Sequence, residues 1–321
     1  MLSLERTKPH QLHYTQALVR RMCRTDEELP DYHARLSNLE AGFYGEQRSD
    51  RELADFTIPH KHYFLHNLEI LNPQGFSHQI DSIVFSLHFL LILEIKNITG
   101  QLCYKPDHHE FSRIRMDGTK ENFSDPFEQA YRHKTFAENL LRSWGITTPV
   151  EYAIVITNQN AMLDDSLQGY PIFHVSGLRR SINYFFVKHP DACMTEEAFE
   201  KAGKRFIDAL HRSIPKRRVS LDRLKKGVLC PRCEFQAVMH YTAGNWQCSS
   251  CGTHNKQALR QALDDYRLLV SERITNKEFR DFTGIYSMHV ASKVLSRLGL
   301  EKVGDKRGRF YIIPENWTAD K

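Results

Sequence analysis

The sequence predicts an α/β fold for residues 36–212, followed by two small modules. Three observations lead to this prediction. Apolar segments of strand length alternate with helical segments across 36–212, which favours a core of strands and helices. Four cysteines with the spacing of a zinc site lie within 230–251. A helix–turn–helix pattern with a basic hairpin follows within 256–321.

The composition is that of an ordinary globular protein. The chain has 321 residues, of which 41% are hydrophobic and 26% charged, and its net charge is +5. These values exclude a disordered or collagen-like chain, and about 100–200 residues per domain allow two or three domains. The longest apolar run, 89–93, is too short to cross a membrane, so we expect no membrane partner. The first eight residues contain no apolar leader, so we expect a cytoplasmic protein.

The expected elements up to residue 212 follow from apolar spacing and turn residues. Residues 1–35 have a helical pattern but no motif that indicates a chemical function. A helix is expected over 38–56. Another helix begins at Asp125-Pro126, with the proline in its first turn, and ends before Gly145. Apolar strands are expected over 58–70, 79–85, 89–98, 151–157 and 172–175, with a turn at 72–75.

Two of these strands carry charged side chains in apolar surroundings. Glu94 and Lys96 lie on one face of their strand because side chains alternate. A hairpin with Leu87-His88 as its two central residues would place Asp81 directly opposite Glu94. Gly or Asn is expected in a two-residue turn, so a longer turn with another register is the alternative.

Two opposed carboxylates repel each other unless a cation lies between them. Mg²⁺ binds oxygen ligands, and such an ion activates water and stabilises charge on a phosphoryl group. A neighbouring lysine can orient that water or stabilise the developing negative charge. The alternative is a structural salt bridge. The apolar strands favour a functional site, because buried charges need compensation.

Four groups of residues carry a family resemblance. They are Gly45-Glu46, Gln79-Ile80-Asp81, Glu94-Ile95-Lys96-Asn97 with Gly100, and Asp125-Pro126 with Gln129 and His133. Together they resemble the nuclease-related domain called NERD, over roughly residues 36–180. That family has the PD-(D/E)xK nuclease-like fold, which implies a restriction-endonuclease-like core with a mixed sheet flanked by helices. Members often carry Gly in the turn where this chain has Leu87-His88.

The resemblance also implies roles for individual residues. Asp81 and Glu94 would bind a catalytic Mg²⁺ or Mn²⁺, and Lys96 would assist the attacking water. Glu46 would support the metal site or Lys96, and Gln129 would lie near the scissile phosphate. The domain would extend over 36–212, after the N-terminal segment 1–35.

A zinc ribbon is predicted over 229–255. Its ligands would be four cysteines in two Cys-x₂-Cys pairs, Cys230, Cys233, Cys248 and Cys251. Four thiolates fill a tetrahedral zinc site, so this zinc would be structural and not catalytic. Disulfides or free thiols are the alternatives, and a cytosolic setting disfavours disulfides. Two short strands would be joined where Gly244-Asn245 reverses the chain before Trp246.

Residues 256–321 predict a winged helix-turn-helix. A helix over 256–273 precedes a short helix capped by Thr275-Asn276, and Ser287 caps another helix. Val290, Val294, Leu295 and Leu298 of this last helix would face inward. Its outward residues would reach a major groove, and basic hairpin residues would contact phosphates or the minor groove. These are His289, Ser292, Lys293 and Arg297 on the helix, and Lys306, Arg307 and Arg309 in the hairpin. The alternative is a helical module for protein contacts.

A basic linker is predicted over 213–228. Eleven Lys or Arg lie between Lys201 and Arg232, most densely at Lys216-Arg217-Arg218. Such clusters attract polyanions by releasing condensed counterions, although a solvated linker explains the charge equally well.

The sequence therefore predicts a Mg²⁺- or Mn²⁺-dependent endonuclease or nickase that hydrolyses DNA phosphodiester bonds. The zinc ribbon and winged helix would hold the duplex, and the sequence does not distinguish DNA from RNA. The alternatives are a non-cleaving DNA-binding or regulatory protein on a nuclease scaffold, and a protein-interaction adaptor. A homo-oligomer is compatible with the sequence, which does not specify the oligomeric state.

Overall fold

A computed structural model describes residues 4–211, 219–305 and 308–315. The chain forms two compact units: Met1–Pro9 with Asn38–Ser213, and His10–Ser37 with Ile214–Lys321. We predicted 1–35 as a segment of its own, whereas its described residues contribute to both units. The other predicted domain boundaries stay predictions. Among the described residues, no helix combines the length and the apolar character needed to cross a bilayer.

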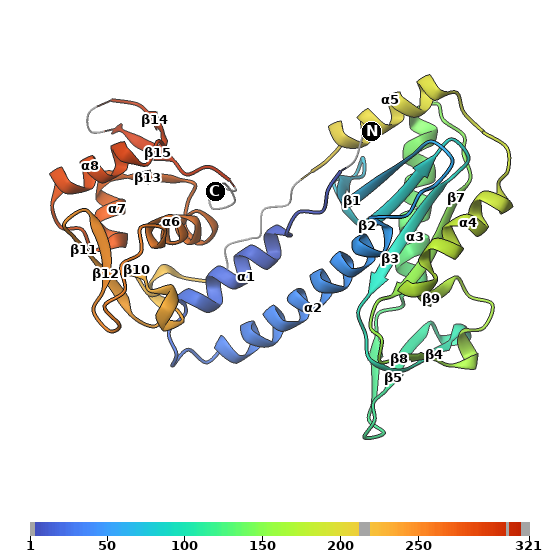
Figure 1. The fold of residues 1–321 in the computed structure, drawn as a ribbon, viewed down its shortest axis with the longest axis horizontal. Helices are drawn as coiled ribbons and strands as arrows, with labels where there is room; N and C mark the ends of the chain where they lie inside the picture. The colour runs from blue at the N-terminus through green and yellow to red at the C-terminus, as the bar shows by residue number, and fades with distance from the viewer. Residues whose placement is uncertain (1–3, 212–218, 306–307, 316–321) are drawn as a thin grey trace. The chain divides into compact units, whose positions relative to one another are not determined.

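The first unit is built on a mixed five-stranded sheet with the order β1-β2-β3-β7-β9 (Figure 1). Its strands are β1 (His62–Leu71), β2 (Ser77–Ser86), β3 (Leu90–Lys96), β7 (Val150–Ile156) and β9 (Ile172–His174). The pairs β1–β2 and β2–β3 are antiparallel, and β3–β7 and β7–β9 are parallel. The central strand β3 therefore has an antiparallel and a parallel neighbour.

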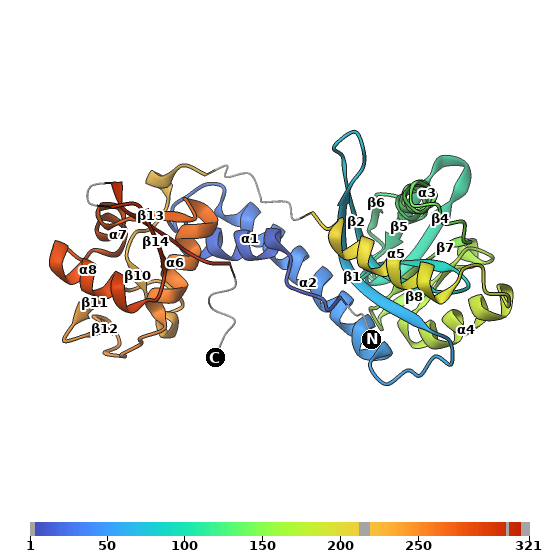
Figure 2. The same ribbon diagram turned by 90° about the horizontal axis from the view of Figure 1, so that it is seen from above.

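Helices cover both faces of this sheet (Figures 1 and 2). They are α2 (Leu29–Leu53), α3 (Pro126–Ser143), α4 (Leu178–Lys188) and α5 (Glu196–Asp208). Leu90 and Ile92 share a core with residues of α3 and α5. Leu91 and Leu93 point the other way and share a core with α4 and the last residue of α2. The predicted α/β fold, with a mixed sheet flanked by helices, is confirmed.

A second sheet of the first unit has the order β6-β5-β4-β8. Its strands are β4 (Gly100–Lys105), β5 (Glu110–Ile114), β6 (Lys120–Phe123) and β8 (Ala161–Leu163). Leu102 and Phe111 of this sheet share a core with Phe127 of α3 and Ile156 of β7. The second sheet therefore packs against α3 and β7, the elements that lie next to the end of β3.

The β2–β3 hairpin has the predicted register, with Ser82 opposite Leu93. The backbone N–H of Ser86 donates to the carbonyl of Phe89 at 3.0 Å, so Leu87-His88 form the two-residue turn. The hydroxyl of Ser86 accepts the N–H groups of His88 and Phe89, both at 3.1 Å. A serine before the turn therefore satisfies backbone donors in a turn that lacks Gly or Asn.

In its described part the second unit contains four whole helices, the first residues of α2 and two small sheets. The helices are α1 (His10–Arg21), α6 (Ala258–Leu269), α7 (Asn276–Thr283) and α8 (Met288–Arg297). One sheet joins β10 (Val228–Leu229), β11 (Val238–Thr242) and β12 (Asn245–Cys248). The other has the order β13-β15-β14, from β13 (Arg273–Thr275), β15 (Phe310–Ile312) and β14 (Glu301–Val303).

Helix α1 belongs to this unit because it packs on α6. Tyr14 and Leu18 share a core with Leu268 and Leu269. Arg21, at the end of α1, donates through Nε to Asp265 at 2.8 Å, and each side chain is 1% exposed. A charge removed from water in this way needs its partner, so the pair fixes how α1 contacts α6.

Several element bounds differ from the predictions. The helix expected over 38–56 already begins at Leu29, and the strand expected from residue 58 begins at His62. Pro59 explains the later start, because proline has no N–H for the ladder. The helix expected over 256–273 ends at Leu269, because Arg273 pairs with Ile312 in a sheet.

Two predicted details of the second unit were wrong. The β11–β12 turn has Ala243 and Gly244 at its centre, with φ of 49° and 86°, which suit a type I′ turn. Val290 is 37% exposed, whereas we expected it to face inward. Ala291, with 0% exposure, takes the inward position in the first turn of α8.

Candidate active site and zinc site

Asp81 takes no part in the backbone ladder between β2 and β1 or in the ladder between β2 and β3. Between β1 and β2, His66 pairs with Ser82 and Leu68 with Ile80, but the intervening Asn67 and Asp81 do not pair. Asn67 has a left-handed φ of 51°. On the other side of β2, the ladder to β3 ends at the pair Ser82–Leu93. The strands therefore separate at Asp81, and its side chain can reach the end of β3.

The Asp81 carboxylate does reach β3. Its Oδ2 accepts the backbone N–H of Ile95 at 2.8 Å. Ile95 lies between Glu94 and Lys96, so this bond places Asp81 beside the two charged residues predicted to share its site. Burial raises the pKa of Asp81.

Glu94 and Lys96 contact each other from the same face of β3, as predicted. Lys96 Nζ donates to Glu94 Oε1 at 2.8 Å. The Glu94 side chain is 1% exposed, and its second oxygen, Oε2, is buried without a hydrogen-bond partner in the described structure. Burial, together with the charge of Asp81, raises the pKa of Glu94 to about 8.

Gln129 completes the contacts of Lys96. Its Oε1 accepts from Lys96 Nζ at 3.1 Å, so the ammonium lies between Gln129 and Glu94. Asp125 fixes the start of α3, because its carboxylate accepts the N–H groups of Phe127 and Glu128 at 2.8 and 3.3 Å. Gln129 follows in the first turn of this helix.

Glu46 approaches the same region from α2. A Cβ on the preceding Gly45 would lie 2.6 Å from Thr157 Oγ1 and 2.7 Å from Asn97 Cβ. Only glycine allows α2 to pack this closely against the ends of β3 and β7. Burial and the charge of Asp81 raise the pKa of Glu46 to about 7, although the charge of Arg6 acts in the opposite direction.

Sequence reasoning missed Arg6, Asp50 and Ser82. Arg6 donates to the carboxylates of Glu46 and Asp50 and to the hydroxyl of Ser82. Asp50 had a usable signal, because it lies four residues after Glu46 and therefore on the same helix face. Arg6 had none, because it precedes Glu46 by 40 residues and lies in a segment without a recognisable motif.

The three carboxylates offer oxygen ligands of the kind a hard divalent cation takes, although among the described residues only the four predicted cysteines of the second unit bring three or more ligand atoms within 4.8 Å of one another. Asp81, Glu94 and Glu46 are close enough for the charge of Asp81 to raise the pKa of the other two. Glu94 Oε2 has no protein partner among the described residues, although a buried oxygen normally has one. Carboxylate oxygens are the ligands that Mg²⁺ and Mn²⁺ prefer.

The comparison with protein families decides the nature of this region. The model of the nuclease-related domain, NERD, matches residues 41–157. This chain contains a nuclease-related domain. Searches of curated proteins and of solved structures found no significant match. The NERD match includes all five predicted site residues, Glu46, Asp81, Glu94, Lys96 and Gln129, whereas Arg6 precedes it.

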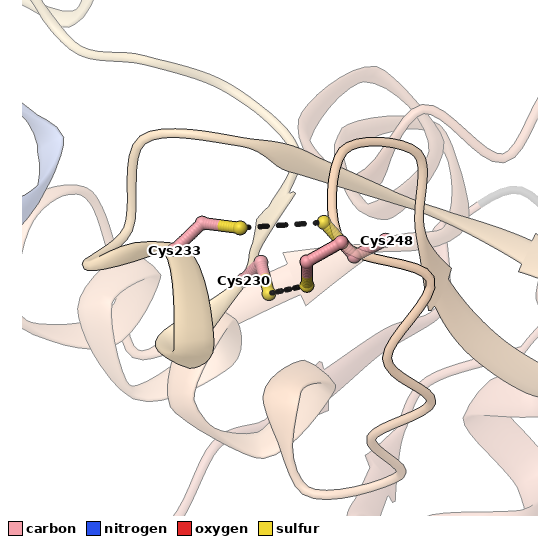
Figure 3. Close-up of side chains that lie close together, drawn as sticks. Cys230, Cys233 and Cys248 are labelled. Carbon is pink, nitrogen blue, oxygen red and sulfur yellow. Dashed lines mark hydrogen bonds between the residues drawn. The ribbon is translucent and has the colours of Figure 1, made fainter.

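The four predicted cysteines of the second unit converge. Figure 3 labels three of them, Cys230, Cys233 and Cys248. Their sulfur atoms all lie within 4.8 Å of one another. The Sγ atoms of Cys230 and Cys251 are 3.7 Å apart, and those of Cys233 and Cys248 are 3.8 Å apart. A disulfide would need about 2.05 Å. Four sulfurs at about 2.3 Å from a tetrahedral zinc lie about 3.8 Å apart, so the cluster is compatible with Zn²⁺.

The thiols of this cluster have opposite pKa shifts. Hydrogen bonds to Thr253 lower the pKa of Cys251 to about 6, whereas hydrogen bonding to Cys251, together with burial, raises the pKa of Cys233 to about 12. Neighbouring sulfurs therefore compete for negative charge. A bound cation removes this competition, because metal ligation requires thiolates.

The predicted nucleic-acid contacts lie partly in described residues. His289, Ser292, Lys293 and Arg297 of α8 are all exposed, as predicted. The side chain of Arg309 is 39% exposed, and its Nη2 lies 3.9 Å from Asp305 Oδ1. Five other predicted contacts lie outside the described residues. These are Lys216, Arg217, Arg218, Lys306 and Arg307.

Proposed function

We propose that this protein is a divalent-metal-dependent nuclease that hydrolyses phosphodiester bonds in DNA. The observation that carries the proposal is the position of Lys96 inside the NERD match. Its ammonium lies between Glu94 Oε1 at 2.8 Å and Gln129 Oε1 at 3.1 Å. Asp81 reaches the same strand end through the N–H of Ile95.

Each side chain has a chemical task in this proposal. Asp81 and Glu94 hold Mg²⁺ or Mn²⁺, and Glu46 supports them from α2. The bound ion supplies an activated water and stabilises charge on the phosphoryl group. Lys96 orients the water or stabilises the developing negative charge, and Gln129 holds the ammonium for that task. The NERD domain thereby presents a cation and an ammonium to a polyanionic substrate.

The second unit would bind the DNA. Helices α7 and α8, followed by the antiparallel β14–β15 pair, would form the winged helix. Lys293 and Arg297 lie four residues apart and share a face of α8, where a major groove would be contacted. The zinc ribbon would be a structural module beside them. A cytoplasmic location and a homo-oligomeric state stay predictions.

A cleavage assay tests the proposal. Supercoiled plasmid is incubated with the wild-type protein and Mg²⁺ or Mn²⁺, and with the variants Asp81→Ala and Lys96→Ala. We expect nicked or linear product from the wild type, none from either variant, and none after chelation. Asp107→Ala and Lys61→Gln are matched controls, because Asp107 is exposed and Lys61 already pairs with Glu196. Single-stranded DNA and RNA substrates in parallel determine the substrate class.

Two other outcomes would contradict nuclease activity. DNA binding by the wild type and both variants, without cleavage by any of them, would indicate a DNA-binding protein on a nuclease scaffold. No binding to any nucleic acid at low salt would indicate a protein-interaction adaptor.

A further inference from the structure

The segment before the NERD match is attached to the candidate active site. The N–H of Leu4 donates to the carbonyl of Phe64 at 3.3 Å, and the N–H of His66 donates to the carbonyl of Leu4 at 3.1 Å. Leu4 thus forms a parallel bridge with β1. Asn67 Nδ2 donates to the carbonyl of Thr7 at 2.7 Å. These bonds hold residues 4–7 at the place where β1 passes Asp81.

Arg6 uses all of its donors in this position. Nε donates to Asp50 Oδ2 at 2.6 Å, and Nη2 donates to Asp50 Oδ1 at 3.0 Å and to Ser82 Oγ at 2.8 Å. Nη1 donates to Glu46 Oε2 and, at 2.8 Å, to Asn67 Oδ1. The side chain is 3% exposed. A guanidinium has five N–H donors, and here each has an acceptor.

These partners surround the acidic site. Glu46 and Asp50 lie one turn apart on α2 and would repel each other without a cation between them. Ser82 directly follows Asp81, and Asn67 lies across from Asp81 at the interruption of the β1–β2 ladder. Arg6 therefore connects α2, β1 and β2 within one residue of Asp81. Its charge offsets two carboxylates that would otherwise add to the repulsion at the site.

We propose that Arg6 is a positioning residue of the acidic site, and that residues 4–7 form part of the functional nuclease unit although they precede the NERD match. Arg6 holds Glu46 in place and leaves Asp81 and Glu94 to bind the divalent cation. This inference rests on the proposed function, because it names the residue that organises the proposed metal site. Lysine cannot replace Arg6, because an ammonium has three donors without the planar fork.

Binding of Mn²⁺, followed by electron paramagnetic resonance of the free ion, tests this role separately from cleavage. The zinc-loaded protein of 321 residues is compared with Arg6→Lys and Asn67→Gly. Asn67→Gly keeps the charge of Arg6 and suits the left-handed φ, but removes the side chain that holds residues 6 and 7. Asp81→Asn shows whether the bound Mn²⁺ occupies the acidic site, because this variant should lose that binding. Glu5→Gln is an exposed control in the same segment as Arg6.

We expect Arg6→Lys and Asn67→Gly each to weaken Mn²⁺ binding and cleavage by about 10–100-fold, the usual effect of losing a partner of a metal ligand. Glu5→Gln should match the wild type. Methylguanidinium should restore part of the Mn²⁺ affinity of Arg6→Ala, which a general loss of stability would not allow.

The outcomes separate the two proposals. Wild-type affinity in both Arg6→Lys and Asn67→Gly would overturn the role of Arg6, even if the wild type cleaves DNA. Mn²⁺ binding that depends on Asp81 and Arg6, without cleavage of any nucleic acid, would support Arg6 and overturn the nuclease. A wild type that neither binds Mn²⁺ nor cleaves would overturn both.

Discussion

The Asp81 carboxylate accepts the backbone N–H of Ile95 at 2.8 Å, at the point where the β2–β3 ladder has ended. A side chain of β2 thus bonds to the backbone of β3 after the last backbone pair, Ser82–Leu93. The strands separate by enough to admit a carboxylate, and this carboxylate lies next to Glu94 and Lys96. The acidic site is therefore built at the opening of an otherwise regular hairpin.

Replacing Asp81 by asparagine separates its charge from its hydrogen bond. The amide oxygen of Asp81→Asn can still accept from Ile95, and the variant no longer repels Glu94 and Glu46. We expect a free energy of unfolding equal to or above that of the wild type without metal, and loss of Mn²⁺ binding. Asp81→Ala, which also loses the hydrogen bond, should be about 0.5–1.5 kcal/mol less stable than Asp81→Asn. Urea denaturation of both variants measures this difference in the free energy of unfolding. Equal values for the two variants would contradict a contribution from the hydrogen bond to Ile95.

Replacing Gly45 tests whether the close packing of α2 against the ends of β3 and β7 positions Glu46. In Gly45→Ala, the new Cβ would meet Thr157 Oγ1 at 2.6 Å and Asn97 Cβ at 2.7 Å, so α2 or the strand ends must move. We expect a loss of about 1–3 kcal/mol of stability and reduced cleavage. Gly42→Ala is the matched control, because nothing lies within 4 Å of its Cβ, and it should be neutral or stabilising. Similar effects at both positions would contradict the packing argument.

Zinc should be necessary for folding of the Cys230–Cys251 cluster and of the core around it. Val228, Met239 and Trp246 share a core with Leu259 of α6, so unfolding of the ribbon exposes that helix as well. Binding energies of structural zinc are about 10–16 kcal/mol, more than a module of this size gains from its own core. We expect a single zinc ion per chain by mass spectrometry, and loss of the ion and of cooperative thermal unfolding in Cys248→Ser. Cys103→Ser, outside the cluster, should retain both.

His133 should make stability depend on pH in the mildly acidic range. Burial, then the neighbouring His78, lowers the pKa of His133 to about 4 from 6.5. Because the unfolded chain binds this proton more readily, the folded state loses stability as pH falls from 6.5 towards 4, by about 3 kcal/mol at most. His133→Leu removes this contribution, so the difference in unfolding free energy between wild type and variant should change over that range. A difference independent of pH would contradict the shift. His108→Gln, an exposed histidine, should leave the profile unchanged.

DNA binding by α8 should depend on salt through Lys293 and Arg297. Each phosphate that a basic side chain neutralises releases counterions, so Lys293→Gln and Arg297→Gln should each reduce the slope of log K against log salt by about 0.9. Fluorescence anisotropy with a duplex at several salt concentrations measures the slope. Lys61→Gln is the control. Unchanged slopes in both α8 variants would show that this helix does not bind phosphates.

The sequence alone predicted the α/β core, the hairpin register that brings Asp81 towards Glu94, and the four cysteines whose sulfur atoms converge. These predictions succeeded because they rest on local rules: side chains alternate in a strand, a short turn sets the register, and paired cysteines mark a metal site. Only the family resemblance pointed to Gln129, as a residue near the scissile phosphate, and its contact with Lys96 comes from the structure.

Only the tertiary structure revealed Arg6, the interruption at Asn67 and Asp81, and the packing of α1 on α6. Arg6 meets Glu46 across 40 residues of sequence, and Arg21 meets Asp265 across 244. No periodicity or spacing connects such residues. Buried charges find their partners through the folded arrangement of distant segments, because removal from water makes a partner necessary but does not specify where in the chain it lies.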